Sequence, residues 1–301
     1  MTKDSIKADW IAVDWGTSNM RAWAMSASGT VLAEATSDQG MGKLSREGFE
    51  PALLAVISDW IDGPTTVIAC GMVGSRQGWV EAPYAAAPCQ ALPEGLVQAP
   101  TTHPDLTVYV IPGIKQTDPA DVMRGEETQI TGFLARNKNW NGVICLPGTH
   151  TKWVHISADE VVSFQTFMTG ELFDTIATQT VLRHSIAADG WDDAAFAEGL
   201  DMGLSRPERL AARLFSLRAN GLLNDMSGTA ARAQLSGLLI GTEIAAAKPY
   251  WLGQQIAVIG DSKLAKLYVG ALATQAVPAT QVNASSITLA GLTAASQRLK
   301  G

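Results

Sequence analysis

The alternation of apolar and polar positions along the chain predicts an α/β protein. Short apolar runs, typical of buried strands, alternate with segments whose apolar residues recur every three or four positions, as on one face of a helix. In the first part of the chain this pattern predicts strands at 10–14, 20–25, 30–36, 66–70 and 107–111 and a helix at 49–61. The stretch 82–104 shows no period, so we expect it to be irregular.

The second part of the chain repeats the opening layout before becoming helical. An apolar run at 143–146, a polar turn and strands at 153–156 and 161–167 copy the first strand, turn and strands. Apolar residues at helical spacing then predict helices at 170–183, 192–204, 207–219, 228–247, 263–273 and 290–299, with a strand at 255–259 before the last two.

The turn after the first strand carries the first candidate chemistry. Asp14 ends an apolar strand, small residues follow, and Arg21 opens the next strand. A turn with little side-chain bulk lets a ligand approach its backbone N–H groups. Asp14 could therefore orient a metal-bound water, and the neighbouring hydroxyl and amide groups suit phosphate oxygens. The alternative is an ordinary hairpin in which Asp14 and Asn19 only shape the turn.

A second turn of the same type follows the strand at 143–146. It contains Gly148, Thr149, Thr151 and Lys152. The threonine hydroxyls and the lysine ammonium group are suited to phosphate. For His150 the simplest interpretation is a turn histidine without a ligand. Two such turns in one chain are harder to attribute to chance than one, so they strengthen the phosphate interpretation.

Three other segments combine glycine with charge. In Gly125-Glu126-Glu127 the acids either complement the dipole of a helix start or provide a general base beside Arg124. The glycine-rich loop 71–79 either places Arg76 near a ligand or only packs its tryptophan onto the domain. Gly260-Asp261, between a strand and a helix, suits a nucleotide at a helix N-terminus, although such junctions are common.

Composition narrows the function classes. The chain has 301 residues, enough for two domains, and a net charge of −7 without a basic cluster, which argues against a nucleic-acid partner. The first ten residues lack the apolar core of a signal peptide, and no run reaches the roughly 18 apolar residues of a membrane helix. We therefore expect a cytoplasmic protein. Three scattered cysteines match neither a disulfide framework nor a zinc site.

The order of these motifs resembles the actin-like ATPase superfamily. The segment 14–19 looks like its phosphate 1 motif, 146–152 like phosphate 2, and 258–262 like the adenosine motif, with one glycine where many relatives have more. The resemblance implies two actin-like, ribonuclease H-like α/β domains with a nucleotide and substrate cleft between them. The first domain would span 1–125, and the terminal helix 288–301 would pack back on it. The second domain would span 126–287 and contain a helical insertion at about 170–225.

At a finer level the chain resembles 2-dehydro-3-deoxygalactonokinases. The segments that carry the resemblance are DWGTSNMRAW, GMVGSRQGW, PGIKQ, DVMRGEETQ, LPGTHTKWV and TGELFD. It implies an enzyme that uses ATP and Mg²⁺ to phosphorylate the terminal hydroxyl of 2-dehydro-3-deoxy-D-galactonate, giving the 6-phosphate in galactonate catabolism. The expected partner is this sugar acid, with no nucleic acid or membrane partner, and a homodimer stays an open option.

The resemblance also assigns roles to residues. Asp14 would act in catalysis and in the Mg²⁺ water shell, and Glu126 would be the base, with Glu127 and Asp121 as open rivals. The substrate contacts would be Arg21, Arg76, Arg124 and Glu127. The ATP contacts would be Gly16, Thr17, Ser18, Asn19, Gly148, Thr149, Thr151, Lys152, Gly260 and Asp261. The alternatives are an exopolyphosphatase-like phosphohydrolase and a non-catalytic, sugar-sensing ATP-binding protein.

Overall fold

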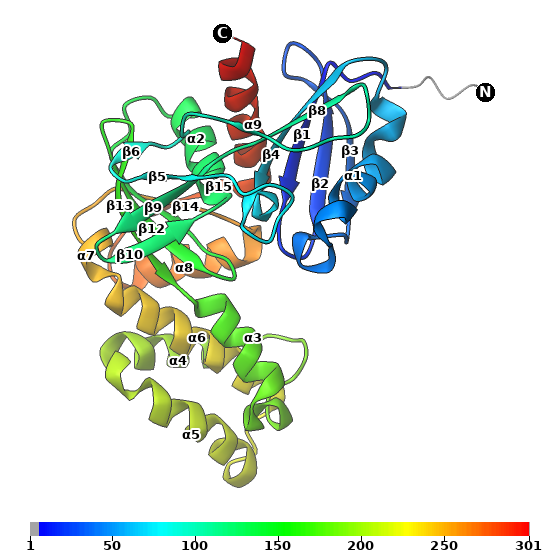
Figure 1. Cartoon of the computed structure of the whole chain (residues 1–301). Helices are drawn as coiled ribbons and strands as arrows, with labels where there is room; N and C mark the ends of the chain where they lie inside the picture. The colour runs from blue at the N-terminus through cyan, green and yellow to red at the C-terminus, as the bar shows by residue number, and fades with distance from the viewer. Residues whose placement is uncertain (1–5, 301) are drawn as a thin grey trace. The chain divides into compact units, whose positions relative to one another are not determined.

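A computed structural model of the chain describes residues 6–300 (Figure 1). These residues form two compact units. Unit 1 contains residues 6–140, 156–163 and 284–300, and unit 2 contains residues 141–155 and 164–283. Each unit is built around a β-sheet and has its own apolar core.

The main sheet of unit 1 has the strand order β3-β2-β1-β4-β8-β7. Its central strand β1 runs antiparallel to β2 and parallel to β4, in a register that places Asp14 beside Arg21 on one side and beside Cys70 on the other. The strands are β1 (Trp10–Trp15), β2 (Met20–Met25), β3 (Val31–Ser37), β4 (Thr65–Gly71), β7 (Val97–Gln98) and β8 (Leu106–Val110).

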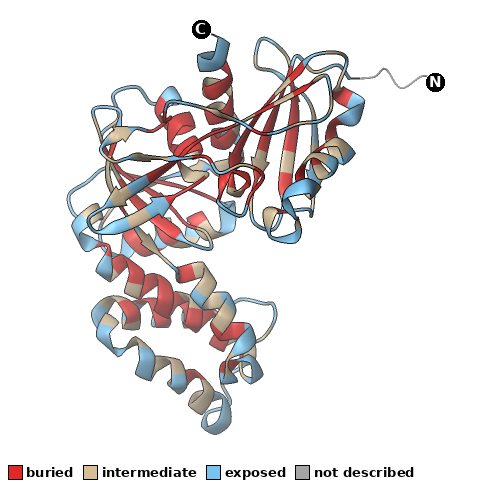
Figure 2. Cartoon of the chain, viewed as in Figure 1, coloured by how far each residue is buried: buried red, intermediate tan, exposed pale blue. Residues whose placement is uncertain are grey.

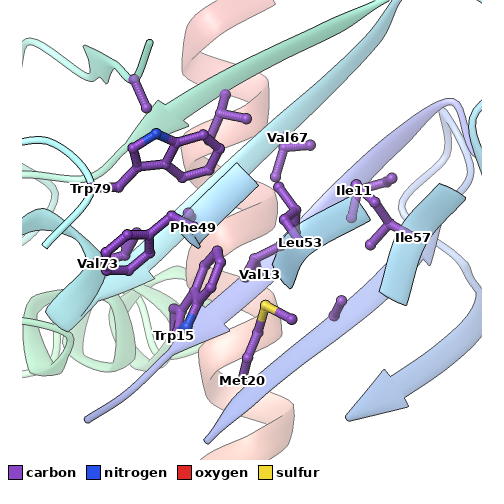
Figure 3. Close-up of a cluster of buried hydrophobic side chains, with 14 of the residues drawn as sticks. Ile11, Val13, Trp15, Met20, Phe49, Leu53, Ile57, Val67, Val73 and Trp79 are labelled. Carbon is purple, nitrogen blue, oxygen red and sulfur yellow. The ribbon is translucent and has the colours of Figure 1, made fainter. Parts of the chain in front are cut away.

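Alternate residues of β1 build two separate cores, because successive strand side chains point to opposite faces. Ile11, Val13 and Trp15 pack in the cluster that contains the buried residues of helix α1 (Phe49–Ile57), as Figure 3 shows. Trp10 and Ala12 of β1 instead join the cluster that contains Leu292 of helix α9 (Ala284–Lys300). Figure 2 shows the resulting buried strands.

Helix α2 (Glu126–Arg136) packs closely against α9 through two glycines. A Cβ atom on Gly132 would lie 2.0 Å from the carbonyl oxygen of Ile287, and one on Gly291 would lie 1.9 Å from that of Thr128. This contact places α2 in unit 1, whereas the resemblance had assigned it to the second domain.

Short strands complete unit 1. A three-stranded sheet has the order β10-β9-β5, and β6 pairs with the first residues of β13. The stretch 82–104, expected to be irregular, therefore contains three short strands, and the hairpin of β9 and β10 was not predicted. The strands are β5 (Tyr84–Ala86), β6 (Cys89–Gln90), β9 (Gly113–Thr117) and β10 (Ala120–Met123).

The strands of unit 2 are arranged in the order β15-β14-β11-β12-β13. Val143, Cys145 and Trp153 share a core with residues of four helices, α4, α6, α7 and α8. A second cluster joins α3, α5 and α6. The elements are β11 (Gly142–Leu146), β12 (Thr151–Ser157), β13 (Glu160–Phe167), β14 (Ile256–Gly260), β15 (Ala279–Asn283), α3 (Thr169–Gln179), α4 (Asp193–Ser205), α5 (Leu210–Leu223), α6 (Gly228–Ala246), α7 (Lys248–Trp251) and α8 (Ser262–Thr274).

Several elements differ from the sequence prediction in their bounds or were missed. The helix expected at 49–61 ends as an α-helix at Ile57 and continues as the 3-10 turn Ser58–Trp60. Strand β15 was missed, and the last helix begins at Ala284, well before residue 290. Further 3-10 turns lie at 41–43, 46–48, 72–74, 181–184 and 207–209.

Candidate active site

The turn between β1 and β2 is held by backbone hydrogen bonds, which leave its polar side chains exposed. The N–H of Gly16 donates to the carbonyl of Asn19 at 2.9 Å, and the N–H of Gly42 donates to the carbonyl of Thr17 at 2.9 Å. A Cβ atom on Gly40 would lie 2.2 Å from the carbonyl carbon of Ser18, so only glycine fits there. Residues 17–19 are exposed.

A pocket of about 610 Å³ opens beside this turn within unit 1. Asp14, Arg21 and three of the predicted phosphate contacts, Gly16, Ser18 and Asn19, line it, whereas Thr17 does not. Its lining consists of Asp14, Gly16, Ser18, Asn19, Met20, Arg21, Thr36, Ser37 and Asp38.

Asp14 is contacted by two side chains in unit 1, Arg21 and Cys70, and Arg21 is itself held by Ser285. Arg21 Nη2 lies 3.0 Å from Asp14 Oδ2, and Arg21 Nη1 donates to Ser285 Oγ at 2.7 Å. On the other side the Cys70 thiol points at Asp14 Oδ1, 3.9 Å away. Burial, together with the charges of Asp14 and Glu127, raises the pKa of the Cys70 thiol well above its ordinary value. Cys70 therefore stays a neutral donor beside the carboxylate.

The predicted substrate-binding arginines lie in different surroundings. Arg124 is buried, donates from Nη2 to the carbonyl of Ala82 at 2.7 Å and stacks 4.2 Å from the centre of the Tyr84 ring. Among the described residues its buried Nη1 has no hydrogen-bond partner. Arg76, by contrast, has a side chain that is 81% exposed and lies 3.5 Å from Glu81. Arg21 is engaged with Asp14.

The acidic start of α2 separates its two glutamates. Gly125 has φ 105°, a conformation that favours glycine, and turns the chain from β10 into the helix. Glu126 is half-buried, and its Oε2 accepts the N–H of Arg124 at 3.0 Å. Glu127 is fully buried; its Oε2 accepts the N–H of Gly125 at 2.6 Å and its Oε1 accepts the Thr128 hydroxyl at 2.9 Å.

The surroundings keep the Glu127 carboxyl away from solvent and leave the Glu126 carboxyl half-buried. Burial, and then the charge of Glu126, raise the pKa of Glu127 from 4.5 to about 8. Glu127 is therefore mostly protonated at neutral pH and is out of contact with solvent. A general base must be ionised and must reach the hydroxyl that it deprotonates. Of this pair, Glu126 is the one in contact with solvent, so it is the better candidate for that role. The third candidate, Asp121, is half-buried in β10, where its Oδ1 accepts the N–H of Val122 at 2.7 Å.

In unit 2 the second turn is held against the start of α3. The N–H of Glu171 donates to the carbonyl of Thr149 at 3.0 Å, and Glu171 Oε2 lies 2.5 Å from His150 Nε2. A Cβ atom on Gly170 would lie 2.3 Å from the carbonyl oxygen of Gly148. His150 thus has a structural partner, and the glycine of the TGELFD segment is required by this close approach.

Gly148 and Thr149 lie at the edge of a pocket of about 1080 Å³ within unit 2. Part of its wall is apolar and includes Phe173, over which the Arg232 guanidinium stacks at 4.9 Å. Asp261 also lines the pocket and caps α8 by accepting the N–H of Lys263 at 3.0 Å. The pocket thus combines an aromatic and aliphatic wall, cationic side chains and a glycine-containing turn, as a nucleotide requires.

The remaining predicted phosphate contacts of unit 2 lie around this pocket rather than in it. Gly260 packs against the turn, since a Cβ atom there would lie 3.0 Å from Pro147 Cγ. Thr151 and Lys152 are buried in β12 and are not among the described residues that line the pocket. The Thr151 hydroxyl lies 3.1 Å from the hydroxyl of Tyr268. The roles of Thr151 and Lys152 as phosphate contacts stay predictions.

Sequence reasoning missed a buried acid behind the turn, Glu243 of α6. Its carboxylate accepts hydrogen bonds from Trp153, Thr169 and Tyr268. Burial raises the pKa of Glu243, against the opposing effect of these donors. The signal was present in the sequence, because Glu243 is the lone acid in a helix otherwise rich in alanine, glycine and leucine.

The described residues contain no preformed metal centre and no membrane span. Nowhere in 6–300 do three or more histidine, cysteine, aspartate or glutamate side chains gather in a way that could hold a metal ion. No helix in that range is long and apolar enough to cross a membrane.

A comparison with models of known protein families shows which family this chain belongs to. The model of the 2-keto-3-deoxy-galactonokinase family matches residues 14–295, a range that contains both turns and the acidic start of α2. The chain belongs to this family. The family resemblance inferred from the sequence is therefore confirmed.

Two curated relatives and one solved structure are similar over nearly the whole chain. A protein of Rhizobium meliloti (strain 1021), named a probable 2-dehydro-3-deoxygalactonokinase, is 42% identical over 96% of this chain and 97% of its own. The 2-dehydro-3-deoxygalactonokinase of Escherichia coli (strain K12) is 33% identical over 95% of this chain and 96% of its own. A crystal structure of a proposed 2-dehydro-3-deoxygalactonokinase from Sinorhizobium meliloti superimposes with a TM-score of 0.89, at 40% identity and 96% coverage of both chains.

A more distant structure supports the fold alone. Component A of the (R)-2-hydroxyglutaryl-CoA dehydratase of Acidaminococcus fermentans is 12% identical, with a TM-score of 0.55 over 99% of this chain and 100% of its own. The expected α/β actin-like fold is confirmed.

Proposed function

We propose that this protein transfers the γ-phosphoryl group of ATP to the terminal hydroxyl of 2-dehydro-3-deoxy-D-galactonate. The observation that carries the proposal is the family match across residues 14–295, together with relatives of this name at 42% and 33% identity. Phosphoryl transfer requires a nucleotide pocket, neutralised phosphate charge and a group that orients the attacking hydroxyl. The two units supply candidates for each.

Unit 2 would hold the nucleotide. Its pocket of about 1080 Å³ is large enough for ATP, and Gly148 and Thr149 at its edge would receive the β- and γ-phosphates through backbone N–H and hydroxyl groups. The adenine ring would lie against the apolar wall, where Phe173 and Arg232 offer a stacking surface. Asp261 and Lys263 lie at the start of α8, where the helix N-terminus favours anionic groups.

Unit 1 would supply the reacting side chains. Asp14 is a single oriented carboxylate, which fits the usual mode of Mg²⁺ binding through one or two carboxylates, water and substrate phosphates. The metal, when bound with ATP, would neutralise developing phosphate charge. Gly16, Thr17, Ser18 and Asn19 would contact phosphate from the exposed turn. Glu126 would accept the proton of the sugar hydroxyl.

The carboxylate of the sugar acid needs a cationic partner, for which a planar guanidinium is well suited. Arg124 has an Nη1 without a partner among the described residues, Arg76 is exposed, and Arg21 is already paired with Asp14. Replacing Arg76 and Arg124 by alanine, singly, should raise KM for the sugar acid while leaving KM for ATP unchanged. An unchanged KM for the sugar acid in both variants would exclude them as its carboxylate partners.

The direct test is a coupled ADP-release assay with 2-dehydro-3-deoxygalactonate, 2-dehydro-3-deoxygluconate and simple hexoses. We expect ADP release only with a keto-deoxy sugar acid, and a loss of about 100-fold or more in kcat for Glu126→Gln. Glu47→Gln, a change on the exposed surface, is the matched control. ADP release that needs no sugar acid would instead support the phosphohydrolase alternative. Binding of ATP and sugar acid without turnover would support the sensing alternative.

Two broader expectations accompany the proposal. A cytoplasmic location would be tested by cell fractionation, and a homodimer by light scattering of the purified protein.

A further inference from the structure

The buried carboxylate of Glu243 connects two segments that flank the Gly148–Thr149 turn. Glu243 lies in α6 and is 2% exposed. Its Oε1 accepts the indole N–H of Trp153 at 2.8 Å, and its Oε2 accepts the Tyr268 hydroxyl at 2.8 Å and the Thr169 hydroxyl. Three donors from β12, α8 and α3 therefore converge on one side chain.

On the strand side, this network fixes the residues that follow the turn. Thr151 and Trp153 are two positions apart in β12, so their side chains share one face of the strand. Because the Tyr268 hydroxyl donates its hydrogen to Glu243, it can accept one from Thr151, whose Oγ1 lies 3.1 Å away. Glu243 thus reaches Trp153 directly and Thr151 through Tyr268.

On the helix side, the network fixes the first residue of α3. Thr169 donates to Glu243, and the next two residues contact the turn. Gly170 packs on the carbonyl of Gly148, and the N–H of Glu171 donates to the carbonyl of Thr149. The position of α3 therefore sets the position of the turn backbone, and Glu243 anchors α3.

We propose that Glu243 is a positioning residue for the Gly148–Thr149 turn, and that it holds the turn's N–H and hydroxyl groups where the β- and γ-phosphates of ATP bind. This inference rests on the proposed nucleotide function of unit 2. The two side-chain oxygens of Glu243 accept from all three donors at once. An amide at the same position has one acceptor oxygen, and its NH₂ group would meet donors, so the flanking segments would have to shift.

The test compares the affinities of Glu243→Gln for ATP and for AMP by calorimetry. AMP lacks the phosphates that the turn would hold, so a misplaced turn should weaken ATP binding by about tenfold and change AMP binding by less than about twofold. We expect KM for ATP to rise with ATP's Kd, and KM for the sugar acid to stay the same. Thr242→Val is the matched control, because the Thr242 hydroxyl is buried on the same helix without a partner among the described residues.

A second variant keeps the test independent of folding. Thr169→Val removes one donor, has nearly the same shape, and leaves Trp153 and Tyr268 on Glu243. It should reduce the ATP-to-AMP affinity ratio in the same direction. The Glu243→Gln and Thr169→Val effects should also fall short of additivity in the double variant, because both act through the same hydrogen bond.

The outcomes separate this inference from the function on which it rests. If the wild-type protein binds ATP and phosphorylates the sugar acid, but ATP and AMP affinities fall together or neither changes in the folded variants, the positioning role is refuted and the kinase function stands. If the wild-type protein neither binds ATP nor phosphorylates the sugar acid, the proposed function itself fails, and the positioning role fails with it.

Discussion

The fully buried carboxyl of Glu127 should make the stability of this protein fall as the pH rises from about 5 to about 8. Burial and the neighbouring Glu126 raise the pKa of Glu127 to about 8 in the folded chain, against 4.5 for an ordinary glutamate. Between these values the unfolded chain has released this proton and the folded chain has kept it. Unfolding therefore releases a proton, and rising pH favours the unfolded state.

The size of the effect follows from the gap between the two pKa values. Each pKa unit corresponds to about 1.4 kcal/mol, so the full gap amounts to about 5 kcal/mol as an order of magnitude. The stabilisation is complete below the ordinary value of 4.5 and is lost as the pH passes through about 8. Within this window the Glu127 contribution should fall by about 1.4 kcal/mol per pH unit.

The assay is urea unfolding of the wild-type protein and of Glu127→Gln, followed by tryptophan fluorescence across this pH range. The glutamine does not titrate, so the difference in unfolding free energy between the two proteins isolates the carboxyl group. Any loss of the hydrogen bonds to Gly125 or Thr128 adds an offset that does not change with pH. Glu47→Gln, on the exposed surface, should give a difference that is flat with pH.

A flat difference for Glu127→Gln would refute the reasoning, because it would mean that the folded chain does not keep this carboxyl protonated. The same variant also bears on the base assignment. Since Glu127 is already mostly neutral at pH 7, Glu127→Gln should retain most of the phosphoryl transfer that Glu126→Gln loses. If Glu126→Gln kept full activity and Glu127→Gln lost it, Glu127 and not Glu126 would be the base.

Three further changes test the packing and the site. Gly291→Ala would place a methyl group 1.9 Å from a carbonyl oxygen and should destabilise the protein by about 1–3 kcal/mol. Gly270→Ala, where a Cβ atom would meet open space, should not destabilise it, and thermal unfolding compares the two variants. Trp79→Ala, in the core of Figure 3, should cost about 3–5 kcal/mol in urea unfolding. Asp14→Asn should lower kcat about 100-fold in the ADP-release assay, with a stability change below about 1 kcal/mol because its ion pair with Arg21 is partly exposed.

The elements that the sequence predicted well are those with a strong local signal. Strands β1, β2 and β4 are mostly apolar and end at, or just before, a glycine or a serine. Both glycine-containing turns fall where they were expected. Gly125 marked the start of α2 because a left-handed residue before an amphipathic run ends one element and begins another. Such features need no knowledge of the partner strands.

The missed elements lack that local signal. Strand β15, with the sequence ATQVN, is mostly exposed and is fixed only by its pairing with β14. The hairpin of β9 and β10 mixes polar and apolar residues without a clear period. Trp79, whose loop was interpreted either as ligand-directed or as simple packing, is buried with Trp15 and Phe49.

The site was predictable as a set of motifs but not as a set of contacts. Asp14 was identified from its place at a strand end. Its neighbour Cys70, however, is brought to it by strand register, and its partner Arg21 is held by Ser285 of α9. Glu243 is remote in sequence from each of its donors. As the lone acid of its helix Glu243 stands out in the sequence, but its role does not, because its three donors lie on segments that meet only in the folded unit.

The alternation of side chains along β1 builds the core of unit 1 and also sets the position of the candidate catalytic carboxylate, Asp14. Ile11, Val13 and Trp15 occupy the face of β1 that packs with α1, so Asp14 must point to the opposite face, where Cys70 and Arg21 flank it. A shift of one residue in the register of β1 would put Asp14 in the apolar cluster and expel Trp15 from it. Misplacing the carboxylate would therefore require losing the core contacts of the strand. The position of Asp14 is consequently as strongly determined as the core itself.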